Sequence, residues 1–314
     1  MSTSTQQQGW TPQQLESLEG KTYVITGANA GAGFEAAKIL LRQGAAVVML
    51  NRNEQKTQKA IEQLKKELGD DCPVFFVQMD LGDFSQVRRA AAELLASVPK
   101  IDALICNAAV GQMAKRESTV EGFESHLGIN HYGHFLLVHL LFDRVEASQG
   151  RIVMVSSEGY KMGLKTIQLS DMNFEKNYNP MTTYCHSKLA QMMFGYELHK
   201  RAQENQRTVA VYVCHPGAAR TSLINEKASR RDRILFSIMS LLPIVQSAEK
   251  GAYPEVMCAT REDLNPEAYY GPTGTMNWSG PVGACTLEPF ALDRALADQL
   301  WTVSEQATQC KWTF

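Results

Sequence analysis

The sequence predicts an α/β fold in which helices cover both faces of a doubly wound parallel sheet, giving three layers in a single domain. Three observations support this prediction. Short β-rich runs alternate with helical patterns along most of the chain. A glycine-rich turn follows the first of these runs and leads into a helical pattern. No Pro/Ser-rich linker or charge block divides the 314 residues.

Seven runs predict strands, and parallel strands of one sheet are expected to be joined by right-handed crossovers. The runs cover residues 21–26, 45–50, 74–78, 101–106, 151–155, 209–214 and 268–272. Helical periodicity occupies the intervals, up to residue 42 and then at residues 54–68, 84–97, 123–142, 182–203, 248–260 and 292–306. Residues 1–19 are predicted to be a polar arm, so the domain is expected to cover residues 20–314.

Composition and charge exclude some classes of protein. Apolar residues make up 44% of the chain and charged residues 20%, as in ordinary soluble globular proteins. A net charge of −2 and a pI near 6.4 give no electrostatic reason to expect nucleic acid as a partner. The seven cysteines lack metal-ligand spacing and the first residues lack an apolar signal region, so we expect a reduced, cytoplasmic protein.

The turn after the first predicted strand has the chemistry of a phosphate site. It runs from Thr26 to Gly33 with the glycine spacing G-x-x-x-G-x-G. Backbone N–H groups in such a turn, together with the N-terminus of the following helix, can hold a pyrophosphate. A glycine pattern alone is compatible with an ordinary turn, but its position between strand and helix favours the phosphate site.

The end of the second strand bears on the type of dinucleotide. An Asp or Glu near this point binds the ribose 2′-hydroxyl of NAD and repels a 2′-phosphate. No acid stands at residues 50–53, and Arg52 offers a forked donor suited to phosphate. The sequence therefore favours NADP over NAD, the alternative being that Arg52 is only a solvated surface charge.

The third and fourth strands end in further candidates. Asp80 could reach an adenine amino group or could simply cap the helix that follows. Asn107 can bridge turns through its side chain. The small residues Ala108 and Ala109 would let a cofactor approach the backbone, although an ordinary turn is again the alternative.

Polar residues also mark the fifth strand and the helix before it. Ser156 and Ser157 follow a strand that is predicted to be buried, at the end where doubly wound sheets bind their ligands. Successive strand residues face opposite ways, so Ser157 is expected to face the substrate and Ser156 to face away from it. Asn130 is a polar amide among apolar neighbours and needs buried partners. The same helix has three histidines without a second set of ligands, so we predict no metal site at His131, His134 and His139.

Tyr184 and Lys188 lie one turn apart in the helical pattern of residues 182–203, so they are expected on one face. A phenol has a pKa near ~10, and a nearby cation lowers it toward working pH. Such a phenol can exchange a proton with a carbonyl or alcohol oxygen. Taken alone, a Tyr and a Lys four residues apart on a helix are more often a partly buried ring and a solvated charge without a catalytic role.

Residues 222–247 combine four basic residues with a long apolar run. The segment is predicted to be a substrate lid, with a membrane-surface helix and ordinary core as the alternatives. Its apolar run is too short and too interrupted for a spanning helix, which needs about 20 residues.

Together these motifs resemble those of the short-chain dehydrogenase/reductase superfamily, and within it the retinol-dehydrogenase-like branch, over residues 20–308. Residues 26–33 are similar to the TGxxxGxG cofactor loop, residues 107–109 to the NAG motif and residues 184–188 to YxxxK. Three runs are similar to the branch itself: residues 130–137 to NHLGHFLL, 184–190 to YCxSKLAN and 215–221 to HPGxxxT. The expected fold is therefore a Rossmann fold.

Three residues depart from the motifs. Ala109 replaces the glycine of NAG, Ala32 replaces an isoleucine in the cofactor loop, and Gln191 replaces the asparagine after KLA. None of these changes removes a catalytic group. Light-dependent protochlorophyllide reductases share the general layout, so they remain a second family to compare.

The resemblance implies a role for each polar candidate. Tyr184 would be the acid and base, Lys188 would lower its pKa and bind the nicotinamide ribose, and Ser157 would bind the substrate oxygen. Asn130 would hold a water that relays protons to Lys188. The charge that develops on the substrate oxygen must be met by donors already in place.

The implied activity is interconversion of a lipophilic alcohol and its aldehyde or ketone with NADP(H). The alternatives are a light-dependent C=C reductase of the protochlorophyllide type and a non-catalytic NADP(H)-binding sensor. Many relatives form dimers through the helices that carry Asn130 and Tyr184, so a homodimer is a further expectation, as is peripheral membrane contact. The cofactor contacts are expected at Gly27, Asn29, Gly31, Ala32, Gly33, Arg52, Asp80, Leu81, Asn107, Ala108, Ala109, Tyr184, Lys188, Pro216, Gly217 and Thr221.

Overall fold

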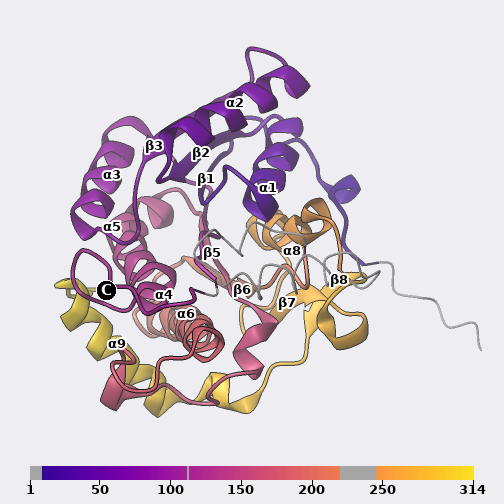
Figure 1. Cartoon of the computed structure of the whole chain (residues 1–314). Helices are drawn as coiled ribbons and strands as arrows, with labels where there is room; N and C mark the ends of the chain where they lie inside the picture. The colour runs from indigo at the N-terminus through magenta and orange to yellow at the C-terminus, as the bar shows by residue number, and fades with distance from the viewer. Residues whose placement is uncertain (1–8, 112, 220–244) are drawn as a thin grey trace, which may run out of the picture.

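A computed structural model describes residues 9–111, 113–219 and 245–314 (Figure 1). Within these residues one sheet of eight strands has the order β3-β2-β1-β4-β5-β6-β7-β8. The strands are β1 (Thr22–Thr26), β2 (Ala46–Asn51), β3 (Val74–Gln78), β4 (Ala103–Cys106), β5 (Arg151–Val155), β6 (Ala210–Cys214), β7 (Tyr269–Pro272) and β8 (Val282–Cys285). Strand order reverses between β1 and β4, as in a doubly wound sheet, which confirms the predicted fold class.

The far edge of the sheet departs from the prediction. The neighbours from β3 through β7 pair in parallel, whereas β8 pairs antiparallel with β7. The strand β8 was not predicted, since Gly and Ala, two of its four residues, are depleted in strands. This strand forms because its backbone pairs with β7, and not because its own residues favour a strand.

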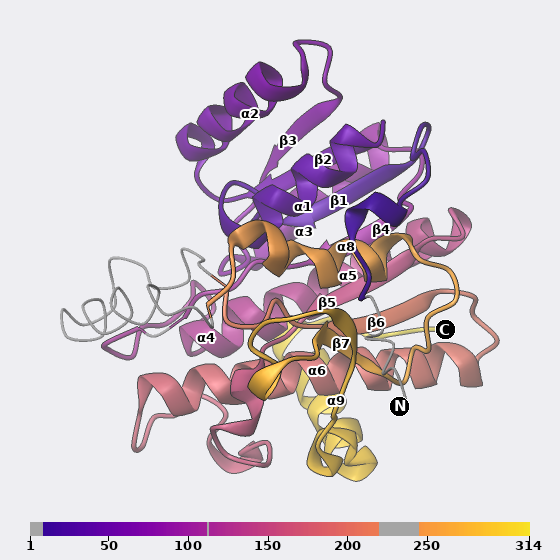
Figure 2. The same ribbon diagram turned by 90° about the vertical axis from the view of Figure 1, so that its right-hand side faces the viewer.

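Helices cover both faces of the sheet (Figures 1 and 2). On one face lie α1 (Gly31–Arg42), α2 (Glu54–Leu68) and α8 (Ala248–Thr260), and Figure 2 shows α1 and α8 side by side. The other face carries α3 (Phe84–Ser97), α5 (His134–Ala147) and α6 (Pro180–Glu204), with α9 (Arg294–Thr308) packed on α6. The protein therefore has the three layers that the sequence predicts.

Alternate residues of the strands supply two apolar cores, one under each helical layer. Val24 of β1 belongs to the core beneath α3, α5 and α6, while Tyr23 and Ile25 belong to the core beneath α1 and α8. This alternation follows from the period of two along a strand. Because both faces are covered, the central strands are buried almost throughout.

The long helix predicted for residues 123–142 is interrupted. A short helix, α4 (Ser125–Leu127), leads into a π-helical turn, η2 (Gly128–Gly133), before α5 begins. A Cβ at Gly133 would lie 2.4 Å from the backbone oxygen of Leu81, so this turn lies against the end of β3. Asn130 lies within the π-helical turn, and π-bulges occur frequently at functional sites.

Both ends of the described chain pack on the domain. Trp10 is buried and its backbone N–H donates to Val282 of β8. At the other end Trp312 packs against Phe135 of α5 and Trp301 of α9. Residues 9–19 therefore do not form a detached arm, and α9 covers the outer side of α6.

The segment predicted as a lid, residues 222–247, lies outside the described residues except for its last three. Of these, Gln246 donates its amide N–H to the backbone oxygen of Pro216, 2.6 Å away. In the described part of the chain no helix is long and apolar enough to cross a membrane. All seven cysteines are free.

Candidate active site

The predicted site residues that the structure describes meet at one edge of the sheet. The carboxyl ends of parallel strands lie at the same edge, and each candidate follows such an end. Thr26 closes β1, Cys106 closes β4, Val155 closes β5 and Cys214 closes β6. The turns and helices that leave these four positions carry the residues described below.

The glycine-rich turn lies against the end of β4. Gly27 has a φ of +70°, and a Cβ there would lie 2.8 Å from Cα of Ala108. A Cβ at Gly33 would lie 2.3 Å from the amide nitrogen of Asn107. Both positions therefore require glycine, one for its backbone conformation and both for space.

The amide of Asn107 bridges the two strand ends. Its Nδ2 donates to the backbone oxygens of Thr26, at 2.8 Å, and Gly27, at 3.2 Å. The hydroxyl of Thr26 accepts a hydrogen bond from the N–H of Ala108 at 2.9 Å. The turns after β1 and β4 are thus held as one unit, as the side-chain chemistry of Asn107 predicts.

Helix α1 begins in this turn without a side-chain cap. Its N-cap residue is Ala30, which makes no capping hydrogen bond. By contrast α2, α3, α6, α8 and α9 are each capped by a side chain, from Asn53, Asp83, Asn179, Ser247 and Asp293. The first N–H groups of α1 therefore lack the usual side-chain acceptor, and an anion can bind them. Asn29 and Ala32 lie in the same turn.

The ends of β2 and β3 bring Arg52 and Asp80 together. The Arg52 side chain is 62% exposed and lies 3.6 Å from the Asp80 carboxylate, a weak surface pair. Asp80 also accepts a hydrogen bond from the backbone N–H of Gly82. Leu81, between these two residues, is buried. Asp83, rather than Asp80, caps the helix that follows, so the capping alternative for Asp80 was wrong.

Asn51, directly before Arg52, was missed by the sequence analysis. It is 4% exposed, and neither its amide nitrogen nor its amide oxygen has a hydrogen-bond partner among the described residues. A buried polar side chain is normally paired. The unpaired amide at the carboxyl end of β2 is therefore a candidate ligand contact.

Tyr184 and Ser157 form the polar centre of the site. Ser157 accepts a hydrogen bond from the N–H of Gly159 at 3.1 Å and is hydrogen-bonded to Tyr184. Burial raises the pKa of Tyr184 to about 12, and the hydrogen bond with Ser157 opposes that rise. Burial is the largest cause, and the direction of the shift is opposite to the lowering that the sequence predicts for a phenol beside an ammonium.

The two adjacent serines have different partners. The hydroxyl of Ser156 is buried and donates to the backbone oxygen of Lys188 at 3.0 Å. Ser157 is only partly buried and contacts Tyr184. This division agrees with the expectation that Ser157, and not Ser156, faces the substrate.

Lys188 lies deep in the site and is 2% exposed. Its Nζ donates to the backbone oxygen of Val155 at 2.8 Å and to Oε1 of Gln191 at 2.9 Å. Burial lowers the pKa of Lys188 to about 7, against the opposing effect of the Glu255 carboxylate. The ammonium is therefore held by neutral oxygen atoms at the end of β5 and on α6.

Asn130 finds the buried partners that the sequence requires. Its amide accepts from the N–H of Val110 at 2.8 Å and donates to the oxygen of the same residue at 3.0 Å. Its Nδ2 also lies 3.0 Å from the hydroxyl of Ser187, the residue before Lys188. Asn130 thus connects the segment after β4 with the helix that carries Tyr184.

The turn after β6 lies at the same edge of the sheet. Gly217 has a φ of +67°, and a Cβ there would lie 2.4 Å from the backbone oxygen of Trp278. Pro216 precedes it and accepts the hydrogen bond from Gln246. The predicted contact at Thr221 lies outside the described residues.

Sequence comparison identifies the family. The family profile described as short chain dehydrogenase matches residues 21–232. Retinol dehydrogenase 12 from Homo sapiens is 36% identical over 298 residues, covering 94% of this chain and 88% of that protein. Retinol dehydrogenase 14 from Mus musculus is 36% identical over 299 residues, covering 92% and 86% respectively. The chain belongs to the short-chain dehydrogenase family.

Solved structures agree with this assignment. An uncharacterized protein from Mycobacterium paratuberculosis matches 98% of this short-chain dehydrogenase and 100% of its own chain, with 31% identity and a TM-score of 0.78. L-Sorbose reductase from Gluconobacter frateurii, complexed with NADPH and L-sorbose, has 22% identity and a TM-score of 0.58 over 78% of this chain and 92% of its own. The second likeness concerns the fold alone.

The predicted resemblance to the retinol-dehydrogenase-like branch is thereby confirmed. A short-chain dehydrogenase is an oxidoreductase that uses NAD(H) or NADP(H), so both the enzyme class and the cofactor class follow from the family.

The histidines on η2 and α5 have structural contacts: His131 pairs with Ser304, His134 with Thr26, and His139 packs on Trp312.

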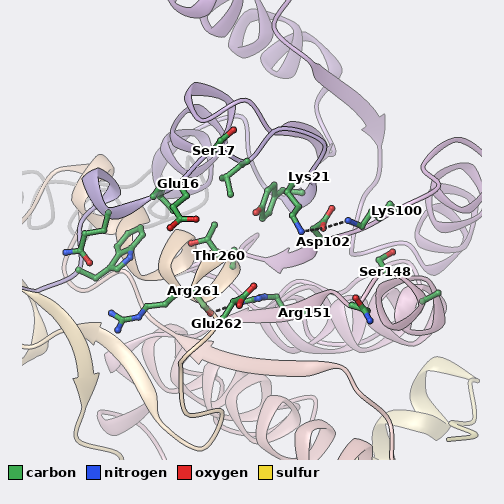
Figure 3. A pocket seen from close by; sticks show the side chains of 18 of the residues that line it. Glu16, Ser17, Lys21, Lys100, Asp102, Ser148, Arg151, Thr260, Arg261 and Glu262 are labelled. Atoms are coloured by element: carbon green, nitrogen blue, oxygen red, sulfur yellow. Dashed lines mark hydrogen bonds and ion pairs between the residues drawn. The ribbon is translucent and has the colours of Figure 1, made fainter.

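A second cavity, of about 970 Å³, lies at the opposite edge of the sheet (Figure 3). It is lined by residues next to the amino ends of β1, β4 and β5. Two of its lysines pair with one aspartate, since Asp102 lies 3.2 Å from Nζ of Lys21 and 2.9 Å from Nζ of Lys100. Arg151 likewise donates to the backbone oxygen of Arg261. This cavity is separate from the site of Tyr184.

Proposed function

We propose that this short-chain dehydrogenase interconverts a lipophilic alcohol and its aldehyde or ketone with NADP(H). The observation that carries the proposal is the buried phenol of Tyr184, hydrogen-bonded to Ser157 at the carboxyl edge of the sheet. With a pKa of about 12, this phenol keeps its proton at neutral pH and can donate it to a carbonyl oxygen. Lys188 lies one helical turn farther along α6.

The other polar groups support the same reaction. The hydroxyl of Ser157 would bind the substrate oxygen that receives the proton from Tyr184. Asn130 is proposed to hold a water that relays protons toward Lys188, and its hydrogen bond with Ser187 keeps it beside the helix that carries Lys188. A bound nicotinamide would supply or accept the hydride, while these side chains hold and move the proton.

The residues present suit a dinucleotide. The uncapped start of α1, preceded by Gly27 and containing Gly31 and Gly33, offers N–H groups to a pyrophosphate. Asn51 has a buried amide without a partner at the end of β2. The proposed contacts are those expected from the sequence, with Asn51 added.

NADP(H) is proposed over NAD(H). No Asp or Glu follows β2 at the position where it would repel a 2′-phosphate. The guanidinium of Arg52 is exposed and directly follows the strand, and a guanidinium binds phosphate through two parallel hydrogen bonds. Asp80 competes for Arg52, but the exposed pair is weak enough to exchange for a phosphate.

A lipophilic substrate is proposed from the relatives. Two of the relatives compared above, each 36% identical to this chain, are named retinol dehydrogenases. This favours alcohol and carbonyl chemistry over reduction of a ring double bond in light. The intact set of Asn130, Ser157, Tyr184 and Lys188 favours an enzyme over a cofactor-binding sensor.

The proposal is tested by following NADPH oxidation with a panel of lipophilic aldehydes and ketones, in light and in darkness. We expect turnover in darkness with at least one retinoid-like or other apolar carbonyl. Turnover that requires light and a porphyrin pigment would replace the proposal by the photoreductase alternative. Binding of NADPH without turnover on any member would favour the sensor.

A further inference from the structure

The ammonium of Lys188 has two protein acceptors. They are the backbone oxygen of Val155, at 2.8 Å, and Oε1 of Gln191, at 2.9 Å. An ammonium carries three N–H donors, so within the described chain one donor of Lys188 remains without an acceptor. The two protein contacts therefore determine where the third N–H points.

The orientation of the Gln191 amide is fixed by its second contact. Its Nε2 donates to the backbone oxygen of Cys106 at 3.3 Å, and the side chain is fully buried. If the amide were turned over, its NH₂ would face the ammonium and its oxygen would face a carbonyl oxygen. The observed orientation is thus the one that satisfies both neighbours.

The two contacts tie Lys188 to the ends of two central strands. Cys106 is the last residue of β4 and Val155 the last residue of β5, and these strands pair directly. Gln191 is three residues after Lys188 on α6, so both side chains lie on one face of the helix. Ser156 holds the backbone of Lys188 through its hydroxyl.

We infer that Gln191 is a positioning residue for Lys188: its amide oxygen holds the ammonium at the strand ends and leaves one N–H for the ribose of the nicotinamide cofactor. This inference rests on the proposed function for its catalytic meaning. Gln191 is also a departure from the family motif, which has the shorter asparagine at this position. The extra methylene gives this chain its reach from α6 to Cys106.

Other titratable groups surround Lys188. Glu255 faces it from α8, Cys106 from β4, Cys214 from β6 and His134 from α5. Both carboxylate oxygens of Glu255 lack hydrogen-bond partners among the described residues, and burial raises its pKa to about 8. No hydrogen bond joins Glu255 to Lys188 among the described residues, so Gln191 and Val155 are the groups that hold the ammonium directly.

The inference is tested by titrating Lys188 in the cofactor-free protein. Lysine labelled with ¹³C at Cε reports the midpoint by NMR, and Lys188→Arg assigns its signal. Gln191→Met keeps the length of the side chain but removes the acceptor, so the midpoint should fall by about one pH unit. Gln191→Glu places an anion beside the ammonium, so the midpoint should rise. A residue that only fills space would not move the two midpoints in opposite directions.

Turnover supplies the second measurement. Gln191→Met should lower kcat for the carbonyl roughly tenfold or more, the cost of one hydrogen bond to a charged group, with KM changed much less. Gln191→Glu, which retains an acceptor, should recover part of the rate. The matched control is Gln203→Met on the exposed end of α6, which should leave both the midpoint and kcat unchanged.

Thermal unfolding first checks that each variant is folded, and if Gln191→Met is not, Gln191→Leu, which also lacks an acceptor, takes its place and its midpoint should fall. Equal midpoints in the wild type and the folded variants would overturn the inference. If no carbonyl of the panel supports NADPH oxidation by the wild type, the proposed function fails. The NMR titration would still decide the role of Gln191.

Discussion

At the scale of single residues, the protonation of Tyr184 decides whether it can act as the acid or as the base of the proposed reaction. Burial raises its pKa to about 12, so the phenol is the dominant form across the neutral range. A phenol is ready to reduce a carbonyl, whereas oxidation of an alcohol needs the phenolate. The phenol can therefore act as an acid over the whole neutral range, whereas its action as a base should depend on pH.

The two directions should consequently differ in their pH dependence. Between about pH 7 and 9 the rate of alcohol oxidation should rise roughly tenfold per unit as the phenolate fraction grows, while the rate of carbonyl reduction stays nearly flat. Initial rates in both directions at saturating cofactor measure this. An oxidation rate that does not change over this range would contradict the assignment of Tyr184 as the base.

Arg52 is expected to distinguish the two cofactors. Arg52→Ala should raise the KM for NADPH about tenfold or more, because a charge-assisted contact with the 2′-phosphate is lost. The KM for NADH should change by less than about twofold, since NADH has no such phosphate. Steady-state kinetics with each cofactor check the prediction, with Lys56→Ala on the exposed side of α2 as control. Equal effects on both cofactors would count against NADP(H).

At the scale of elements, α9 and the residues after it complete the apolar core over α5 and α6. Trp312 is 9% exposed and packs against Phe135, Phe142, Phe194 and Trp301. Figure 1 shows α9, in yellow, beside α6. Because α9 covers the outer side of α6, a homodimer through that side would have α9 in its contact.

Removal of this ring should therefore destabilise the whole protein. Trp312→Ala should lower the free energy of unfolding by about 3 kcal/mol, as expected for a large buried aromatic side chain. Phe75→Ala, on a ring that is 55% exposed in the edge strand β3, is the control and should cost much less. Urea unfolding of the three proteins decides, and similar losses in both variants would refute the structural role of Trp312.

The elements also mark where prediction from sequence succeeds. Strands such as β5 and helices such as α2 follow from periodicity, because their residues alone have the required pattern. The strand β8 depends on pairing with β7, and the π-helical turn η2 on a contact with Leu81 that is remote in sequence. Likewise Tyr184 and Lys188 could be identified from their spacing, whereas the unpaired amide of Asn51 emerges only from the packed fold.

Gln191 lies between these two cases. Its spacing of three residues from Lys188 already places it on the same helical face. What the sequence could not supply is the position of Cys106, which orients the amide toward the ammonium.

At the scale of the whole molecule, buried histidines should make the fold sensitive to acid. Burial lowers the pKa of His131, His134 and His215 to about 3. In the unfolded chain these groups take up protons below a pKa of about 6.5, whereas in the folded protein they do not. The unfolded state therefore binds more protons between these values, and stability falls as the pH drops through the window.

His131→Gln should reduce this acid sensitivity. The variant keeps a polar partner for Ser304 but loses one titrating group. Between about pH 6.0 and 4.5 the wild type should lose roughly 2 kcal/mol more of its free energy of unfolding than the variant, from about 1.4 kcal/mol per pH unit. Urea titrations at the two pH values measure the difference. An identical loss in both proteins would contradict the neutral, buried state of His131.

The central claim is that Tyr184 transfers the proton in an NADP(H)-dependent carbonyl reduction. Its most direct test is the rate of NADPH oxidation with the best carbonyl of the panel, compared between the wild type and Tyr184→Phe. Tyr253→Phe on α8 serves as control. We expect Tyr184→Phe to lose turnover by about 1,000-fold, within the range of general acid catalysis, while it still binds NADPH. A kcat near that of the wild type in Tyr184→Phe would contradict the account.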